Sequence, residues 1–320
     1  MTRVSAGARI HVGFQNLSLS HERLYGGVGF ALDSPRVTIE ATPADSVRCG
    51  DTLVAEYATA VCDLLNVPGV DLTVEERLPR HVGLGSGTQI ALATLTAVAE
   101  AHDREPRVRE RAPALGRGGR SGVGVATFER GGFVVDAGHP TTRFTTDTPE
   151  DGSWTVPPVV VRHDLPESWR VLLVYPDADA GRSGETEDAS MRAAVERADP
   201  GLANELAGIL TRRLLPAVAA GECEPFGQAV TAFDRRNGTW YTDAQGGVYR
   251  PPAGALVDEL EASPALSGVG QSSWGPAVYG ITDASRERAA REAGEAALDA
   301  VGVAGSVKTV ALANTGARIE

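Results

Sequence analysis

The stretch Pro79-Arg80-His81-Val82-Gly83-Leu84-Gly85-Ser86-Gly87-Thr88-Gln89 precedes an alanine-rich segment that runs to Ala101 and has high helix propensity. We therefore expect the end of a strand, a glycine loop and the start of a helix. Glycines let a ligand approach the backbone closely, and the first turn of the helix points unpaired N–H groups and the positive end of its dipole into the loop. Phosphate or diphosphate is the ligand that such a loop favours.

The loop does not match the common phosphate-binding motifs. A Walker A loop requires a lysine that is absent here, and the dinucleotide pattern G-x-G-x-x-G fails at its last glycine. A G-x-S-x-G nucleophile elbow is also absent, because Ser86 is one place too late. A tight turn before a helix is the structural alternative. Three glycines, the hydroxyls of Ser86 and Thr88, and Arg80 and His81 at the entrance favour an anion site.

The residues before the loop predict several strands. Every second position from Val4 to Val12 is apolar, and the polar positions between them include Arg9 and His11, for which a solvated strand face is the default interpretation. Further elements are expected in chain order: a glycine-rich turn at Tyr25-Gly26-Gly27-Val28-Gly29 leading to a second strand, a third strand after Pro35, a helix capped by Asp51, and a strand at residues 70–74.

The residues after the loop predict a second unit with a different order of elements. Strands are expected at residues 125–128 and 133–136, followed by a connection between the two halves at residues 141–158. The second half is expected to run as strand 171–175, helices to about Asn237, another helix, a strand, strand 277–281, helix 284–300 and strand 307–313. This order predicts a split β-α-β sandwich, and we expect domains at residues 1–160 and 161–320.

Composition limits the class of protein. The 320 residues are 42% hydrophobic and 22% charged, which excludes a disordered or fibrous chain. Thirty basic and 42 acidic residues give a net charge of −12, and Lys308 is the only lysine. Such a surface repels nucleic acids and anionic membranes. It also suits a cytosol of high salt, although a high-GC genome would equally replace lysine by arginine.

Cysteine usage and the first residues bear on the compartment. The three cysteines are an odd number without C-x-x-C spacing, so that neither a disulfide framework nor a zinc site is indicated. The first fifteen residues have no apolar core of a signal peptide, and we find no run long enough to span a bilayer. We expect a cytoplasmic protein.

A second glycine-rich passage, Arg117-Gly118-Gly119-Arg120-Ser121-Gly122, carries two arginines. Guanidinium groups on a glycine loop suit the capture of phosphate or carboxylate, and a solvated hairpin is the alternative. Asp136 and His139 follow the next apolar run, where they are suited to metal ligation or general-base chemistry; a turn-capping aspartate and a surface histidine are the alternative.

Two later segments complete the candidates. Gly270-Gln271-Ser272-Ser273-Trp274-Gly275-Pro276 places an amide, two hydroxyls and an indole between two strands, which favours a pocket over a core tryptophan in a turn. Arg182-Ser183-Gly184-Glu185 is weaker, because Glu185 suits a helix cap better than a magnesium ligand.

Taken in order, these motifs resemble the GHMP kinase superfamily, through Arg9-Ile10-His11, the Gly83–Gly87 loop, Arg120-Ser121-Gly122-Val123 and the late glycine and serine loop. More closely, the chain resembles the β-ribofuranosylaminobenzene 5′-phosphate synthase family. The stretches that carry this closer resemblance are residues 25–29, 81–89, 117–124, 131–139, 245–249 and 270–276.

The resemblance implies an α+β, two-lobed GHMP-kinase-like fold, with a phosphate loop in the N-terminal domain and a ferredoxin-like C-terminal domain. It implies condensation of phosphoribosyl diphosphate with 4-aminobenzoate or 4-hydroxybenzoate, with loss of diphosphate and CO2, in methanopterin biosynthesis. Kinases of the superfamily commonly carry an aspartate two places after the Ser-Gly pair, where this chain has Gly124. An ATP-dependent small-molecule kinase is the second candidate function. A homologue that binds ligand without catalysis is the third.

The resemblance also implies roles for the candidate residues. Catalytic roles are expected for Arg120, Asp136 and His139. Mg²⁺ is expected as cofactor, with Glu185 as a weak ligand, and a homodimer is plausible from the kinase relatives. Substrate or phosphate binding is expected for Arg9, Gly26, Gly27, His81, Gly83, Gly85, Ser86, Gly87, Thr88, Gln89, Arg117, Ser121, Gln271, Ser272, Ser273 and Trp274.

Overall fold

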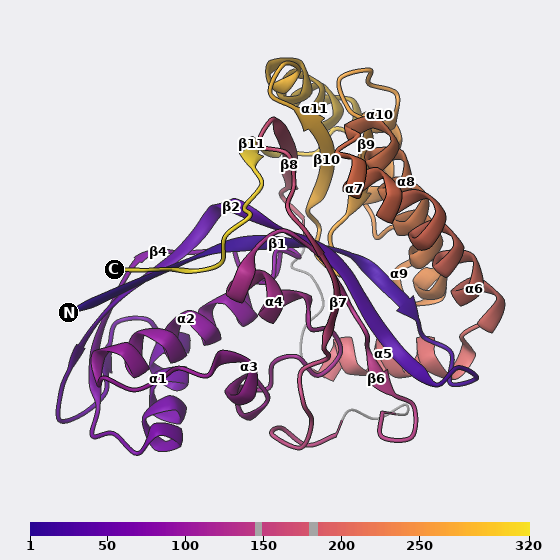
Figure 1. The fold of residues 1–320 in the computed structure, drawn as a ribbon. Helices are drawn as coiled ribbons and strands as arrows, with labels where there is room; N and C mark the ends of the chain where they lie inside the picture. Colours follow the sequence, from indigo (N-terminus) through magenta and orange to yellow (C-terminus); the bar gives the residue numbers. More distant parts are fainter. Residues whose placement is uncertain (145–148, 179–184) are drawn as a thin grey trace.

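The computed structural model describes residues 1–144, 149–178 and 185–320, and the side chains of residues 185–187 are outside this description. Two sheets organise the described chain (Figure 1). The larger sheet has the order β12-β1-β2-β4-β3, with β5 and β6 paired to β2 and β7 paired to β5. Its strands are β1 (Thr2–Asn16), β2 (Arg23–Pro43), β3 (Arg48–Cys49), β4 (Val70–Glu76), β5 (Phe133–Asp136), β6 (His139–Pro140), β7 (Val159–His163) and β12 (Arg318–Ile319).

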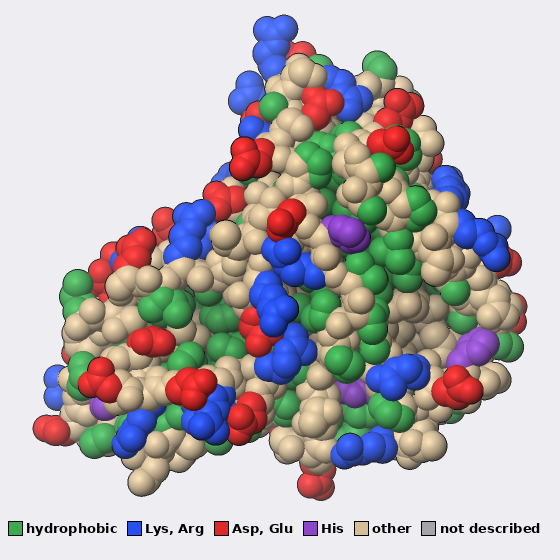
Figure 2. Space-filling model, in the orientation of Figure 1, with side chains coloured by type: hydrophobic (Ala, Val, Ile, Leu, Met, Phe, Trp, Pro, Cys, Tyr) green, Lys and Arg blue, Asp and Glu red, His purple; other side chains and the backbone are tan. Residues whose placement is uncertain are grey.

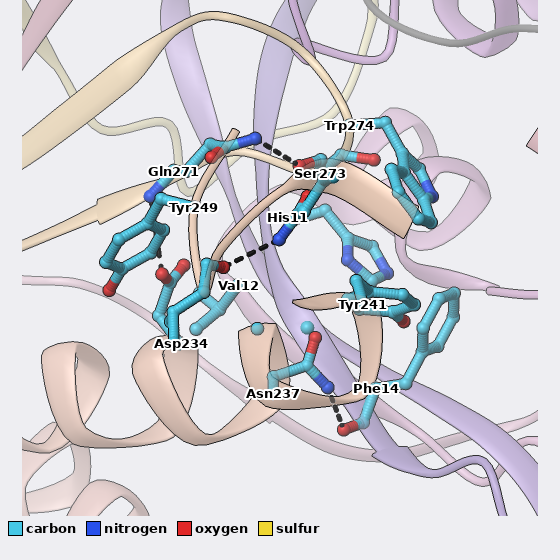
Figure 3. A pocket seen from close by; sticks show the side chains of 14 residues that line it. His11, Val12, Phe14, Asp234, Asn237, Tyr241, Tyr249, Gln271, Ser273 and Trp274 are labelled. Atoms are coloured by element: carbon cyan, nitrogen blue, oxygen red, sulfur yellow. Dashed lines mark hydrogen bonds between the residues drawn. The ribbon is translucent and has the colours of Figure 1, made fainter. Parts of the chain in front are cut away.

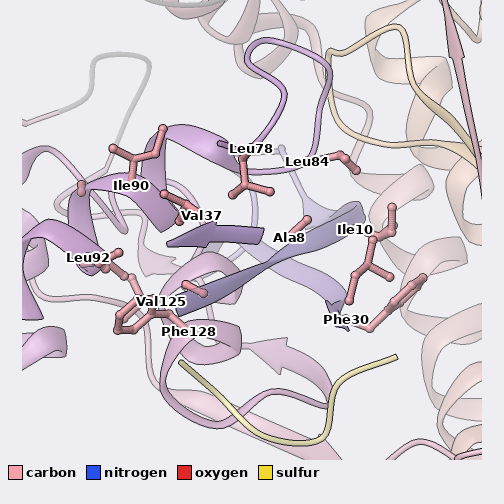
Figure 4. Packing of buried hydrophobic residues seen from close by; sticks show 14 of the residues in the cluster. Ala8, Ile10, Phe30, Val37, Leu78, Leu84, Ile90, Leu92, Val125 and Phe128 are labelled. Atoms are coloured by element: carbon pink, nitrogen blue, oxygen red, sulfur yellow. The ribbon is translucent and has the colours of Figure 1, made fainter. Parts of the chain in front are cut away.

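Helices cover one face of the larger sheet and form the first core. They are α1 (Thr52–Leu65), α2 (Ser86–Ala101), α3 (Val108–Arg111), the 3-10 turn η1 (Ala112–Leu115) and α4 (Val123–Arg130). Asp51 caps α1 as predicted, because its carboxylate accepts the Val54 N–H at 3.2 Å. Figure 4 shows Leu92 of α2 and Phe128 of α4 packed beside Val37 of β2. This core fixes the N-terminal end of α2, where the glycine loop lies.

The second sheet has the order β11-β8-β10-β9 and is antiparallel throughout. Its strands are β8 (Trp169–Pro176), β9 (Gly268–Gln271), β10 (Val278–Asp283) and β11 (Gly305–Ala311). The helices of this half are α5 (Glu185–Arg197), α6 (Pro200–Ile209), the π-turn η2 (Leu210–Leu214), α7 (Leu215–Ala220), α8 (Cys223–Gly238), the 3-10 turn η3 (Thr239–Tyr241), α9 (Thr242–Gln245), α10 (Ala253–Glu261) and α11 (Glu287–Val301). The predicted split β-α-β sandwich is confirmed.

Three sequence-based assignments are wrong. Residues 25–29 are not a turn but part of β2, which has 21 residues and pairs with β1 between Tyr25 and Ala41. The third strand expected after Pro35 is the second half of this same strand. Gly27 and Gly29 sit in that strand because other groups approach it closely: a Cβ at Gly29 would lie 2.3 Å from the Ile10 carbonyl oxygen. Residues 125–128 are not a strand but belong to α4, whose apolar side chains are buried on several sides.

The passage between the two sheets also lies later than expected. Residues 141–158 join β6 to β7, which are both strands of the larger sheet, and the chain reaches the second sheet only after His163. The C-terminal strand β12 then returns to pair with β1 of the larger sheet. The predicted domain boundary at 160/161 falls within β7, and the division into two domains stays a prediction.

Charged side chains of both signs are mixed over the face shown in Figure 2, and basic groups form a column over the region of β7 and α4. Of the helices that the structure describes, none combines the length and apolar character that crossing a membrane requires. The −12 charge is therefore not spread as one uninterrupted acidic surface on this face.

Candidate active site

The glycine loop lies between β4 and α2, as predicted. Gly83 and Gly85 have φ angles of 95° and 77°, which side-chain-bearing residues rarely adopt. Gly85 is the N-cap residue of α2 and has no side chain with which to cap it. The amides of the first turn, which begins at Ser86, are therefore placed to bind an anion. His81, at the entrance to the loop, is exposed and also has a positive φ of 59°.

The late loop at residues 270–276 supports the glycine loop from the other half of the chain. Arg9 Nη1 and Ser272 Oγ both donate to the Gly83 carbonyl oxygen, at 2.6 and 2.8 Å. A Cβ at Gly83 would lie 2.0 Å from the Ser272 carbonyl oxygen, and one at Gly275 would lie 2.0 Å from the Val82 carbonyl carbon. Ser272 is fully buried, so its hydroxyl shapes the loop. Two segments that are far apart in sequence thus form one surface.

Arg117 reaches the first turn of α2. Its Nη1 would lie 3.4 Å from a Cβ placed on Gly87, and its Nη2 donates to the Tyr57 hydroxyl. The Arg117 guanidinium also lies 5.5 Å from the centre of the Tyr57 ring. Its charge is therefore held beside the glycine loop by a neutral partner, and the predicted role of Arg117 in anion binding stays a prediction.

Arg120 lies on the same glycine-rich passage but has a charged partner. Its Nη2 donates to the Asp188 carboxylate of α5, and only 17% of the Arg120 side chain is exposed. Burial raises the pKa of the Tyr25 hydroxyl, and Arg120 lies close enough to oppose that rise. Arg120 therefore links α5 to the start of β2, at the edge of the site.

Asp136 lies beneath this passage and organises it. One carboxylate oxygen accepts from the Gly122 N–H at 2.7 Å and from Ser121 Oγ at 3.1 Å, and the other accepts from the Gly138 N–H at 2.8 Å. Gly27 permits this packing, since a Cβ there would lie 2.1 Å from Ser121 Oγ. Burial raises the pKa of Asp136 to about 6, so the carboxylate is mostly ionised at neutral pH.

His139 supports the same passage from another side. Its ring stacks on Phe144 with 3.6 Å between centroids, and Nε2 lies 3.2 Å from the Gly118 carbonyl oxygen. Burial lowers the pKa of His139 to about 4, so the imidazole is neutral at pH 7. His139 is only 3% exposed, so the alternative of a surface histidine is wrong. Asp136 and His139 both contact the arginine loop, and their predicted catalytic roles stay predictions.

A partly enclosed pocket adjoins the late loop (Figure 3). Gln271, Ser273 and Trp274 line it, as the sequence suggested. The Gln271 amide Nε2 is bonded to the Ser273 and Gly275 carbonyl oxygens at 3.3 and 3.1 Å, so it fixes the loop. The remaining walls come from β1, α8, η3, the end of α9 and the turn after it, through His11, Val12, Gly13, Phe14, Asp234, Asn237, Gly238, Tyr241, Gln245, Val248 and Tyr249.

Sequence reasoning missed the aromatic and polar walls of this pocket. His11 was assigned by default to a solvated strand face, yet the residue is only 6% exposed. Tyr241 and Trp274 contact each other with 4.6 Å between ring centroids. Asn237 donates to the Phe14 carbonyl oxygen at 2.8 Å, across 223 residues of sequence. The only sequence signal for the wall formed by β1 was that His11 alternates with the apolar Ile10 and Val12, which places it on the opposite face of the strand from them.

Other predicted ligands have structural partners. Gln89 is 1% exposed, and its Nε2 donates to the Gly124 carbonyl oxygen at 3.0 Å, so it joins α2 to α4 and is not open to a ligand. Gly26 contacts the Gln15 amide, which would lie 2.6 Å from a Cβ. Thr88 faces Gly124, where a Cβ would lie 3.0 Å from the threonine methyl carbon. Glu185 begins α5, and its side chain is outside the described residues, as are residues 182–184.

Comparisons with known proteins agree on one family. Residues 52–132 match the family described as the GHMP kinases N terminal domain. The chain is 34% identical over 302 residues to the β-ribofuranosylphenol 5′-phosphate synthase of Methanothermobacter thermautotrophicus, and the match covers 88% of each chain. It is 33% identical over 294 residues to the enzyme of the same name from Archaeoglobus fulgidus, with 89% of each chain covered.

The fold has relatives among solved structures. Homoserine kinase from Cytophaga hutchinsonii aligns with a TM-score of 0.70 over 100% of this chain and 97% of that one. The sequence identity is 16%, so this likeness concerns the fold alone. The two-lobed α+β GHMP-kinase-like fold predicted from the sequence is confirmed.

Proposed function

Because the chain belongs to the β-ribofuranosylphenol 5′-phosphate synthase family, we propose that it joins phosphoribosyl diphosphate to 4-hydroxybenzoate and releases diphosphate and CO2. The product is a β-ribofuranosylphenol 5′-phosphate, as in methanopterin biosynthesis. The observation that carries this proposal is an identity above 30% to these two synthases over almost nine tenths of the chain. The phenol in the relatives' name favours the 4-hydroxy over the 4-amino substrate.

The reaction forms one carbon–carbon bond and breaks two bonds. The bond from the anomeric carbon to diphosphate breaks, and its electron pair leaves with the diphosphate. The ring carbon that bears the carboxylate attacks the anomeric carbon. The bond between ring and carboxylate then breaks, its electron pair restores the aromatic ring, and CO2 leaves. No net proton is consumed or released, so the site must mainly stabilise the leaving charge and align the two carbons.

The glycine loop and Arg117 form the proposed diphosphate site. The amides at the start of α2 and the Arg117 guanidinium lie on the same side of the loop, since Arg117 lies beside Gly87. Both place positive charge where negative charge develops on the leaving group. Arg9 keeps the loop in shape through Gly83. Asp136 holds the arginine passage in place by accepting from the Gly122 N–H.

Mg²⁺ is proposed to arrive with phosphoribosyl diphosphate as part of the substrate. Mg²⁺ usually keeps water ligands and is bound through substrate phosphates and one or two carboxylates. Among the side chains of residues 1–144, 149–178 and 188–320, no three histidine, cysteine, aspartate or glutamate groups gather into a metal site. The described residues therefore do not fit an all-protein magnesium site, and the role of Glu185 remains a proposal.

Gly124 favours the synthase over the runner-up kinase. The kinases to which the fold is related commonly use an aspartate at this position to act on an acceptor hydroxyl, whereas glycine has no side chain to do so. Here Gly124 packs against Thr88 of the phosphate loop, so that a larger side chain would crowd the loop. The chain thus has the proposed phosphate-binding glycine loop but lacks the aspartate that the kinases use on the acceptor hydroxyl.

A release assay separates the candidate functions. The purified protein is incubated with phosphoribosyl diphosphate and carboxyl-labelled 4-hydroxybenzoate, at several KCl concentrations, and in parallel with ATP and small acceptor alcohols. We expect equal amounts of labelled CO2 and diphosphate and no ADP. Formation of ADP without CO2 would support the kinase, and binding of phosphoribosyl diphosphate without turnover would support a binding homologue.

Three further properties belong to the same proposal. We expect a cytoplasmic enzyme, as a biosynthetic role implies. A homodimer is expected by analogy with kinase relatives, and sedimentation at several protein concentrations tests it. Activity that increases with KCl would support a high-salt cytosol as the origin of the −12 charge, whereas best activity at low salt would contradict it.

A further inference from the structure

His11 carries a buried polar atom without a partner. The residue is 6% exposed and lines the pocket of Figure 3. Among the described residues, its Nε2 is buried and has no hydrogen-bond partner. A buried ring nitrogen that bonds to nothing costs free energy, so such atoms usually meet a ligand or water. The nitrogen is therefore a candidate contact for a polar group of a ligand.

The surroundings of His11 favour an aromatic ligand. The Phe14 ring lies edge-on to the imidazole with 4.8 Å between centroids, and Tyr241 and Trp274 form a second edge-on pair. Figure 3 shows these rings on one side of the pocket, opposite Asp234 and Tyr249. Aromatic walls bind a flat ring well, and one polar atom among them fixes its orientation.

The imidazole is neutral, which makes Nε2 a hydrogen-bond acceptor when the proton is on Nδ1. Burial lowers the pKa of His11 to about 3, and the charge of Arg9 adds to this effect. Asp234, on the opposite wall, has its pKa raised by burial to about 8, so it is mostly protonated at pH 7. This pocket therefore suits a neutral donor such as a phenol hydroxyl better than a charged group.

The position of His11 relative to the phosphate loop matches a para-substituted ring. Arg9 and His11 are two residues apart on one face of β1, which separates their Cα atoms by about 6.5 Å. Arg9 contacts the glycine loop, and the Ser272 hydroxyl links the His11 N–H to the Gly83 carbonyl oxygen. A ring whose hydroxyl meets His11 can therefore direct its opposite carbon towards the phosphate loop.

We propose that His11 Nε2 accepts a hydrogen bond from the 4-hydroxyl of the benzoate substrate and thereby orients the ring within the pocket formed with Phe14, Tyr241 and Trp274. This inference rests on the proposed function and names a specificity-determining residue within it. When the ring carbon attacks, positive charge spreads to the 4-oxygen and its proton shifts towards Nε2. The proton returns to the oxygen when CO2 leaves, so that protons balance.

Binding and kinetics of two variants test the role of His11. His11→Phe keeps an aromatic ring and removes the acceptor, and His11→Asn keeps a polar group in a smaller side chain. His163→Phe, on β7, is the matched control for a histidine-to-phenylalanine change. Equilibrium binding of 4-hydroxybenzoate and of unsubstituted benzoate is measured by calorimetry for each protein, together with kcat and KM for CO2 release.

We expect His11→Phe to weaken the binding of 4-hydroxybenzoate about tenfold, the factor that corresponds to one neutral hydrogen bond. The affinity for benzoate should stay within about twofold of the wild-type value. The KM for phosphoribosyl diphosphate should not change, and His11→Asn should recover part of the loss. Equal weakening of both benzoates would mean that His11 only packs the pocket, and would overturn the proposal.

The wild-type protein keeps the proposal testable if both His11 variants fail to fold. It must then bind 4-hydroxybenzoate more tightly than benzoate and 4-methoxybenzoate, since only the hydroxyl can donate; equal affinity for all three would refute the role of His11. Absence of CO2 release by the wild type, with this preference intact, would instead refute the proposed function. The two failures are therefore distinguishable.

Discussion

Replacing Asp136 with asparagine should change how stability depends on pH. Asp136 is fully buried, and burial raises its pKa from 3.8 to about 6 despite the donors around it. A carboxyl whose pKa is higher in the folded than in the unfolded state stabilises the fold when protonated. Its contribution is complete below the unfolded pKa and is lost as pH rises through about 6.

The size of the effect follows from that shift. A difference of about two pH units corresponds to a loss of about 3 kcal/mol over the whole transition, of which about 2 kcal/mol falls between pH 4.5 and 7.5. Asparagine does not titrate, so the Asp136→Asn protein lacks this loss. At each pH, asparagine also replaces an acceptor by a donor opposite an N–H group, which adds a constant penalty of about 1–3 kcal/mol.

The assay is urea unfolding of both proteins from pH 4.5 to 7.5 at one KCl concentration. The free energy of unfolding of the wild type, minus that of Asp136→Asn, should fall by about 2 kcal/mol across this range. Other titrating groups are common to both proteins and cancel. Asp45→Asn, at an exposed position, is the matched control and should show no such trend. A difference between wild type and Asp136→Asn that is constant with pH would refute the reasoning.

Three further substitutions address the phosphate loop. Arg117→Lys should lower kcat/KM for phosphoribosyl diphosphate at least about tenfold, because lysine cannot keep the same forked contacts; unchanged kinetics would remove Arg117 from the site. Gly275→Ala should destabilise the protein by about 1–3 kcal/mol in thermal unfolding, because the new Cβ meets the Val82 backbone, whereas Gly50→Ala, in open space, should not; equal effects would contradict the close packing. Ser272→Ala should raise KM for phosphoribosyl diphosphate several-fold through lost support of Gly83, and an effect confined to benzoate would contradict that role.

Local sequence patterns predicted the conformation of the glycine loop and the second sheet well. The turn before α2 needs glycines at positive φ, and this requirement is visible in the residues themselves. The order β8, β9, β10, α11 and β11 follows from the alternation of short apolar runs and one long amphipathic helix. Both features depend on neighbours in sequence, and periodicity reports such neighbours directly.

Features that depend on distant neighbours were not predictable in this way. The residues from Tyr25 to Gly29 look like a turn because glycines are common in turns, but Gly27 is required by Ser121 and Asp136, more than 90 residues away in sequence. The apolar run of α4 is too short for its period to distinguish helix from strand. The aromatic pocket combines His11 with Tyr241 and Trp274, and no pattern in one segment reports that proximity.

The net charge of −12 and the arrangement of arginines both bear on how the proposed anionic substrate would bind. Arg120 is paired with the Asp188 carboxylate, so a substrate anion must compete with that contact. Arg117 is instead held by the neutral Tyr57 and forms no ion pair with the carboxylates that the structure describes, so we propose that a ligand balances its charge beside Gly87. Salt screens charges that are farther apart than about 10 Å at 0.1 M much more than groups in contact. Moderate salt should therefore reduce the repulsion from the acidic surface more than it weakens the contact with Arg117.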